Sequence, residues 1–132
     1  MSDNVPSGLK YTKDHEWAKV DGTDVAVGVT SFAVEQLGDI TLVNIDVKAG
    51  DSVVAGKAFG TIESVKTLSD LYAPVSGKVV KVNADLETKP ELVNEDCYGK
   101  GWMVVIAVDG AGAATAEMMD EKAYAEFLKT SR

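Results

Sequence analysis

Short runs that mix apolar and polar residues dominate the first hundred positions and indicate β-strands. Lys78–Asn83 sets valines among charged residues in the pattern of a half-buried strand. Leu9–Val20 and Val25–Val29 flank the turn sequence Asp21-Gly22-Thr23 and predict an opening hairpin. Turn residues interrupt the pattern every few positions, which argues against a helical bundle.

Further strands are predicted on both sides of a tight turn at Val65-Lys66. They are Ile40–Val47, Ser52–Ala55, Ala58–Ser64, Leu68–Ala73 and Trp102–Val108. A polar, proline-containing connection is expected over Ala84–Lys100. The halves on either side of Lys66 share one layout, an extended stretch, a turn and another extended stretch. A pseudo-symmetric β-sandwich places their junction at an exposed corner.

Two helices interrupt this pattern. Thr30 or Ser31 can cap a short helix through Leu37, and Gly38 permits a left-handed stop. The second helix is predicted over Asp120–Lys129, and Asp120 can serve as its N-terminal cap. Its apolar face consists of Ala123, Tyr124, Phe127 and Leu128. We expect this face to pack across the sheets. The predicted fold is therefore mainly β, with a short helix in the N-terminal half and a C-terminal helix.

The chain has 132 residues, of which 45% are apolar, and this size suits one domain with a substantial core. We expect residues 1–132 to form a single compact domain. Residues 1–8 are predicted to be a flexible tail and residues 9–109 the β core. Residues 110–132 are predicted to hold a flexible linker, Gly110–Ala114, and the closing helix.

Charge narrows the range of binding partners, and other features of the chain indicate its compartment. The 21 acidic and 13 basic residues give a formal charge of -8, which disfavours binding to nucleic acid or to an anionic membrane. Trp102–Val108 is too short to cross a bilayer. Residues 1–8 lack the layout of a signal or transit peptide. A cytoplasmic location is expected, or the mitochondrial matrix if a leader was removed; the single cysteine, Cys97, agrees with a reducing compartment.

Lys66 is the candidate functional residue. A lysine in an exposed turn is usually only a solvated charge. Here, however, two strands present it on a rigid base, and its stem of four carbons ends in an amine that can be acylated. Amide formation removes the positive charge and leaves an unbranched arm that is free to swing.

Two half-motifs flank this lysine. They are Gly50-Asp51-Ser52-Val53 with Gly56, and Ala73-Pro74-Val75-Ser76-Gly77-Lys78-Val79, with Ile62-Glu63 shortly before Lys66. This stretch resembles the biotinyl and lipoyl carrier domains, so a β-sandwich of the lipoyl/biotinyl (barrel-sandwich hybrid) type is implied. Biotin carriers have methionine on both sides of the lysine. The neighbours here are Val65 and Thr67, so lipoate fits better.

The rest of the chain extends the resemblance. The relevant motifs are His15-Glu16-Trp17, Gln36–Ile40, Glu63–Lys66, Pro90–Asp96, Tyr98-Gly99 and Gly101-Trp102. Together they are similar to the H proteins of the glycine cleavage system over nearly the whole length. Cys97 departs from the pattern, because a proline is expected there, and this puts only the local turn geometry in question.

The resemblance implies that the chain is a carrier and not an enzyme, with lipoate attached to Lys66 through an amide. The implied partners are glycine decarboxylase (P protein), the folate-dependent aminomethyltransferase (T protein) and dihydrolipoyl dehydrogenase (L protein). A lipoate ligase or octanoyltransferase would load the lysine. The carrier would take the aminomethyl group of glycine from the first enzyme to the second, and electrons to the third. Tethering keeps this cargo at high local concentration.

We further expect the loaded arm to fold into a groove that excludes water. The expectation rests on apolar residues near the hairpin, namely Val65, Leu68, Leu71 and Tyr72. Two alternatives to the main function remain open. One is a relay that passes octanoyl or lipoyl groups to other proteins, and the other is an unmodified adaptor domain.

Other constellations are weaker. His15 is the single histidine, so zinc clusters and triads that need several His or Cys ligands are nearly excluded. A dyad of Cys97 and His15 lacks a matching signature. Tyr98-Gly99-Lys100-Gly101 lacks the spacing of a phosphate loop. Trp17 and Trp102 could form an aromatic docking site, although burial in a core is the commoner use.

Overall fold

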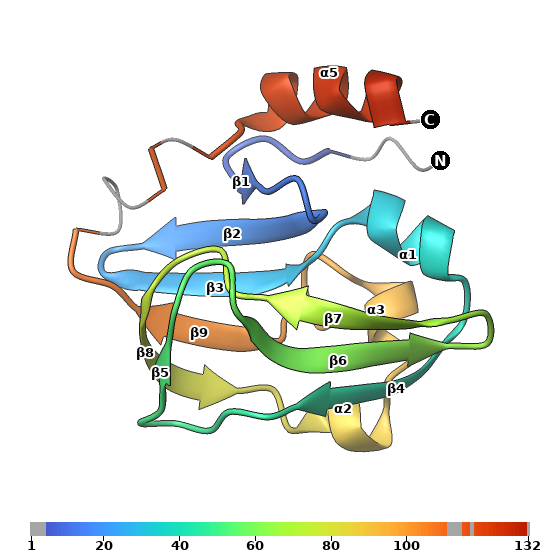
Figure 1. Ribbon diagram of the computed structural model, residues 1–132, viewed down its shortest axis with the longest axis horizontal. Coiled ribbons are helices and arrows are strands. Elements are labelled where there is room, and N and C mark those ends of the chain that lie inside the picture. The colour runs from blue at the N-terminus through green and yellow to red at the C-terminus, as the bar shows by residue number, and fades with distance from the viewer. Residues whose placement is uncertain (1–4, 111–114, 117, 132) are drawn as a thin grey trace.

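Two antiparallel sheets form the body of the molecule (Figure 1). The computed structural model describes residues 5–110, 115–116 and 118–131. The six-stranded sheet contains, in spatial order, β1 (Lys10–Tyr11), β2 (Glu16–Asp21), β3 (Asp24–Val29), β9 (Val104–Ala107), β8 (Gly77–Val82) and β5 (Ser52–Val53). The three-stranded sheet contains β4 (Ile40–Ile45), β6 (Ala58–Ser64) and β7 (Leu68–Tyr72). The mainly β architecture predicted from the sequence is confirmed.

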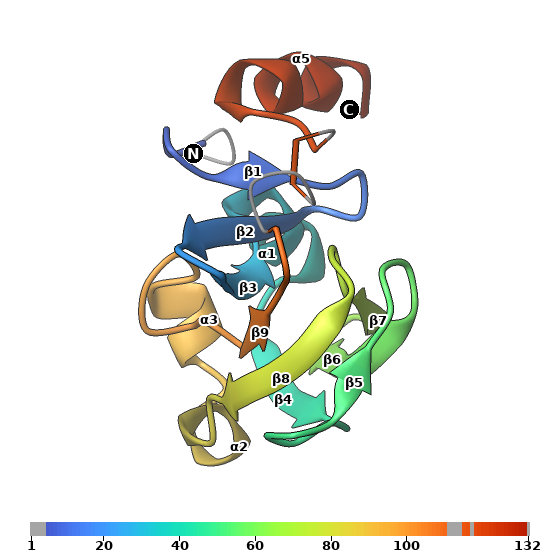
Figure 2. The same ribbon diagram turned by 90° about the vertical axis from the view of Figure 1, so that its left-hand side faces the viewer.

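The main core lies between the two sheets. Val25 and Val27 of β3 are fully buried, as is Ile106 of β9, while Ile62 and Leu71 face them from the smaller sheet. Their spacing follows the two-residue period of a strand with one face inward. Burial of such side chains contributes roughly 1.5–3 kcal/mol each. Figure 2 shows the small sheet set against the lower part of the large one.

Helix α1 (Ser31–Leu37) has the predicted boundaries. The Thr30 hydroxyl accepts a hydrogen bond from the Ala33 N–H at 3.3 Å, which caps the first turn. Gly38 ends the helix with φ at 82°, a conformation that glycine adopts without steric cost. The helix leads directly into β4.

Two short helices lie in the segment that was predicted only as a polar connection. They are α2 (Asp85–Thr88) and α3 (Leu92–Glu95). Each is four residues long and buries one main side chain, Leu86 or Val93. Such short helices show no repeating apolar face, so periodicity could not reveal them.

Helix α5 (Glu121–Ser131) confirms the predicted closing helix, and Asp120 accepts from the Ala123 N–H at 2.8 Å. Its expected position across the sheets was wrong. It packs at the β1 end of the large sheet (Figures 1 and 2). There the Tyr124 ring stacks on that of Tyr11, with ring centroids 4.6 Å apart. Backbone hydrogen bonds between Tyr11 and Met119 pin the segment before the helix.

Some sequence predictions fall outside the described residues, namely positions 1–4 of the predicted flexible tail and 111–114 of the predicted linker. Within the described part, no helix is long and apolar enough to cross a membrane.

Candidate functional site

Lys66 lies at the exposed tip of the hairpin between β6 and β7 (Figure 1). The hairpin closes through the Ser64 N–H, which donates to the Thr67 carbonyl at 2.8 Å. The buried Ser64 hydroxyl also accepts from the Lys66 and Thr67 N–H groups, both at 3.2 Å. One serine therefore holds the backbone of the turn and leaves the lysine side chain outside.

The turn that follows α1 supports this hairpin from the side. The Val65 N–H donates to the Asp39 carbonyl at 3.1 Å. The Lys66 stem lies against Gly38, because a Cβ atom built on that glycine would come within 3.2 Å of Lys66 Cε. A larger residue than glycine at position 38 would therefore crowd the lysine.

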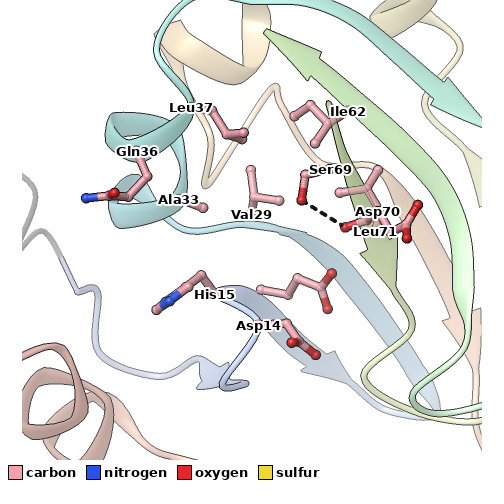
Figure 3. A pocket seen from close by; sticks show the side chains of 11 residues that line it. Asp14, His15, Val29, Ala33, Gln36, Leu37, Ile62, Ser69, Asp70 and Leu71 are labelled. Carbon is pink, nitrogen blue, oxygen red and sulfur yellow. Dashed lines mark hydrogen bonds between the residues drawn. The ribbon is translucent and has the colours of Figure 1, made fainter. Parts of the chain in front are cut away.

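A cavity of about 150 Å³ adjoins the hairpin (Figure 3). Its walls come from α1, from β3, β6 and β7, and from the start of β2 with the two residues before it. Leu37 stands next to the turn at Gly38, and Ser69 is three residues beyond Lys66. The other lining residues are Asp14, His15, Glu16, Val29, Ala33, Gln36, Ile62, Asp70 and Leu71. The cavity thus combines an apolar interior with several polar groups from the 14–16 segment and β7.

Glu16 is the most perturbed of these polar groups. It is 3% exposed, and its Oε2 accepts from the Tyr72 N–H at 2.7 Å. Within the described part of the chain, its buried Oε1 has no hydrogen-bond partner. Burial raises the pKa of this carboxyl to about 8, against the smaller opposing effect of the Tyr72 bond. Burial therefore favours the protonated form, and a hydrogen-bond donor or a cation at Oε1 would shift the balance towards the carboxylate.

Comparison with known proteins identifies the family of this chain. A family model described as Glycine cleavage H-protein matches residues 9–131. The glycine cleavage system H protein of Myxococcus xanthus is 50% identical over 137 residues, covering 99% of this chain and 100% of that protein. The chain belongs to the glycine cleavage H-protein family. The H protein of Halalkalibacterium halodurans is 49% identical over 125 residues, 95% of this chain and 96% of that one.

The fold of the H-protein family matches as well. The crystal structure of a glycine cleavage system H protein from Mycobacterium marinum superposes with a TM-score of 0.85 at 37% identity. The match covers 95% of this chain and 99% of that one. The predicted lipoyl-type sandwich is confirmed. The family carries lipoyl groups, and its members are carrier components of the glycine cleavage system, not catalysts.

The alternative nucleophilic dyad does not suit this H-protein fold. Cys97 is buried, and burial raises the pKa of its thiol to about 11, which disfavours the reactive thiolate. The His15 Nδ1 atom lies 2.8 Å from the Tyr124 hydroxyl instead, with the ring against Phe32 and Phe127. Among the described residues, no group of three His, Cys, Asp or Glu side chains could hold a metal ion.

The tryptophans have different environments. Trp17 is buried in a second apolar cluster, formed with Tyr11, Phe32, Tyr124 and Leu128. Its Nε1 donates to the Cys97 carbonyl at 2.9 Å. Trp102 is partly buried and packs against the same cluster. The interpretation of Trp17 as a core residue is therefore correct. Cys97 stands where a proline was expected, and its backbone carbonyl accepts the hydrogen bond of the indole.

The apolar residues that suggested a groove are only partly in the right place. Val65 and Leu68 are 67% and 63% exposed, so they point to solvent beside the lysine and not into the cavity. Leu71 lines the cavity, whereas Tyr72 contributes its backbone N–H to Glu16. A cavity exists, but its apolar walls combine Ile62 and Leu71 of the hairpin strands with residues of β3 and α1, which are distant in sequence from the hairpin.

Sequence reasoning missed three residues that shape the site. Ser64 and Glu16 were each inside a family motif, but only a three-dimensional contact shows what their side chains do. Asn94 was inside another motif, and its side chain reaches the turn after α1. The partners of Glu16 and Asn94 lie more than fifty residues away, so no local signal shows their roles, whereas Ser64 acts on the turn two and three residues ahead of it.

Proposed function

We propose that Lys66 carries lipoate as an amide and that the chain conveys the aminomethyl group of glycine between enzymes of the cleavage system. The observation that carries this proposal is the exposed lysine at a braced hairpin tip in a chain of the H-protein family. The whole chain would act as one carrier unit. Its donor would be glycine decarboxylase, its acceptor the aminomethyltransferase, and dihydrolipoyl dehydrogenase would take its electrons.

The residues present fit this cofactor. The Lys66 amine is at the surface, where a lipoate ligase or octanoyltransferase can reach it, while the turn backbone is held by Ser64. The neighbouring cavity is apolar at Leu37 and Leu71, which suits an aliphatic arm. When bound, lipoate supplies a disulfide that accepts a carbon unit and two electrons.

The cavity residues have a role of their own in this proposal. The cavity has apolar walls beside its polar groups, and in the described structure Glu16 lines it with a buried carboxyl whose Oε1 has no hydrogen-bond partner. A cargo that bears an amine would satisfy that oxygen, and its positive charge would favour the ionised form of Glu16. We therefore propose that Glu16 binds the amine of the cargo and that Leu37, Ile62 and Leu71 shield it from hydrolysis.

The surface charge supports protein partners with basic docking faces. A formal charge of -8 on 132 residues attracts cationic surfaces over a Debye length and speeds their encounter. The relatives named above are bacterial, which supports a cytoplasmic site of action for this chain.

Mass measurement of the protein from its native cells tests this function. We expect the intact mass to show one lipoyl group and peptide mapping to place it on Lys66. The Lys66→Arg variant should abolish both the modification and glycine-dependent growth. A bare lysine in cells, with the arginine variant fully active, would instead support the adaptor alternative. Lipoylation with normal glycine cleavage but defective lipoylation of other proteins would support the relay alternative.

A further inference from the structure

The side-chain amide of Asn94 makes two hydrogen bonds to the backbone turn after α1. Its Nδ2 donates to the Gly38 carbonyl at 2.9 Å, and its Oδ1 accepts from the Ile40 N–H at 2.9 Å. Donor and acceptor of one amide thus bracket Asp39, although the partners are 56 and 54 residues away in sequence. Aspartate has the same shape but could make only the second bond.

The bracketed turn is the part of the molecule on which the lysine hairpin rests. The Asp39 carbonyl accepts from the Val65 N–H, and Ile40 pairs with Ser64 in the ladder between β4 and β6. Gly38 lies against the stem of Lys66. Each of these three consecutive turn residues therefore contacts the hairpin, and Asn94 holds the first and the third.

Asn94 can serve as a fixed point because α3 is anchored. Val93 is fully buried in the main core, and the Asp96 carbonyl accepts from the N–H groups of Gly99 and Gly101. The Asn94 side chain itself is exposed and is hydrogen-bonded to the connection from α1 to β4. Its removal should therefore leave the core intact.

The same segment also holds the other end of α1. The Ser31 N–H donates to the Tyr98 hydroxyl at 3.0 Å. Residues 94 and 98 thus fasten both ends of the helix that carries Ala33, Gln36 and Leu37 into the cavity. This arrangement makes the 94–98 segment a support for the cavity wall as well as for the hairpin.

We propose that Asn94 is a positioning residue for Lys66, which it presents for acylation by fixing the turn at Gly38–Ile40. The inference rests on the proposed attachment of an acyl group at Lys66. Without the two hydrogen bonds of the Asn94 side chain, the turn gains conformational freedom. An acylating enzyme must then order the hairpin as it binds. The cost should appear as a raised KM with little change in kcat, because the bound hairpin is ordered in either protein.

The test compares Asn94→Ala, Asn94→Asp and a matched control, Asn44→Ala. Asn44 is an exposed asparagine of β4 whose amide donates to Asp46, and it pairs with Thr61 of β6, five residues before Lys66 at the hairpin tip. Acylation of the unmodified chain by a lipoate ligase with octanoate and ATP is followed by intact mass. Amide hydrogen exchange at Val65 is measured on the same proteins. The alanine variant should show KM raised and Val65 exchange accelerated, each by about two- to tenfold, the range expected for a lost hydrogen bond.

The aspartate variant keeps the acceptor for the Ile40 N–H but sets a carboxylate oxygen against the Gly38 carbonyl, so its KM and its Val65 exchange should also exceed those of the wild type. The control should match the wild type in both measurements. Unchanged KM and Val65 exchange in Asn94→Ala would overturn the proposal, and so would an equal acceleration of exchange at all amides, which marks a merely structural role. If the wild-type chain is not acylated at all, the proposed function fails, while exchange at Val65 still decides whether Asn94 braces the hairpin.

Discussion

The Tyr124 hydroxyl lies 2.8 Å from His15 Nδ1 and 2.8 Å from the Thr30 hydroxyl. Tyr124 belongs to α5, His15 lines the cavity, and Thr30 caps α1. The C-terminal helix is thereby linked to two walls of the cavity through one phenol. His15 itself has φ at 65°, an uncommon conformation for a residue other than glycine, so the contact also helps to hold a strained backbone.

The first prediction concerns this phenol. Tyr124→Phe keeps the ring stacked on Tyr11 but leaves the buried hydroxyl of Thr30 and Nδ1 of His15 with one partner fewer. We expect a loss of about 1–3 kcal/mol in the free energy of unfolding, measured in urea. Tyr72→Phe is the control, because the Tyr72 hydroxyl is exposed and its contact with an Asp70 oxygen is long, at 3.4 Å. Equal losses in the two variants would contradict the role of the link.

The second prediction concerns pH and Glu16. Its pKa is raised from 4.5 to about 8 in the folded chain, so the folded state holds this proton more tightly than the unfolded state. The contribution of this carboxyl to the free energy of unfolding is therefore fully present below about pH 4.5, and it is lost as the pH rises towards 8. Glu16→Gln keeps an acceptor for the Tyr72 N–H and removes the titration.

The Glu16→Gln variant should accordingly gain stability over the wild type at pH 9, by at most about 4–5 kcal/mol at about 1.4 kcal/mol per pKa unit. At pH 4 the two proteins should unfold at nearly the same temperature. Thermal unfolding across this range measures the difference. If the difference in stability between the wild type and the variant were the same at pH 4 and pH 9, Glu16 would titrate normally.

The third prediction concerns the packing of Trp17 on Gly28, its partner in the ladder between β2 and β3. A Cβ atom at Gly28 would lie 2.6 Å from the indole, so Gly28→Ala must displace a buried ring. We expect a cost of about 1–3 kcal/mol, the range for an overpacked core. Red-shifted tryptophan fluorescence should accompany it. In the control Gly22→Ala nothing lies within 4 Å and only the positive φ is strained, so the fluorescence should not change.

The fourth prediction concerns the hairpin serine. Ser64→Ala removes the hydroxyl that accepts from the Lys66 and Thr67 N–H groups. The free energy of unfolding should fall by about 1 kcal/mol, and the turn amides should exchange faster. Ser52→Ala, an exposed serine in β5, serves as the control. If hydrogen exchange at Lys66 and Thr67 stayed at the wild-type rate, the serine would not be holding the turn.

Local chemistry explains why so much of the fold could be predicted. The boundaries of α1 follow from a hydroxyl at Thr30 and a glycine at position 38, both of which act within one turn of chain. The lysine hairpin likewise follows from two adjacent strands and a short turn. The short helices α2 and α3 escaped prediction because each has a single main buried anchor and no repeat.

The position of α5 and the cavity could not be predicted for a different reason. The amphipathic face of α5 shows that it packs, but several apolar surfaces could receive it, and Tyr11 of β1 does so. The buried carboxyl of Glu16 is invisible in the sequence, where an acidic residue beside a histidine suggests a solvated surface.

The sequence by itself determined the mainly β layout, the two longer helices, the exposed lysine and the family motifs around it. These depend on side chains that act on neighbouring backbone. Only the tertiary structure decided that Asn94 reaches the turn beneath Lys66 and that Glu16 keeps one oxygen unpartnered in the described chain. Such contacts join elements more than fifty residues apart, and they form because the buried core fixes where each element lies.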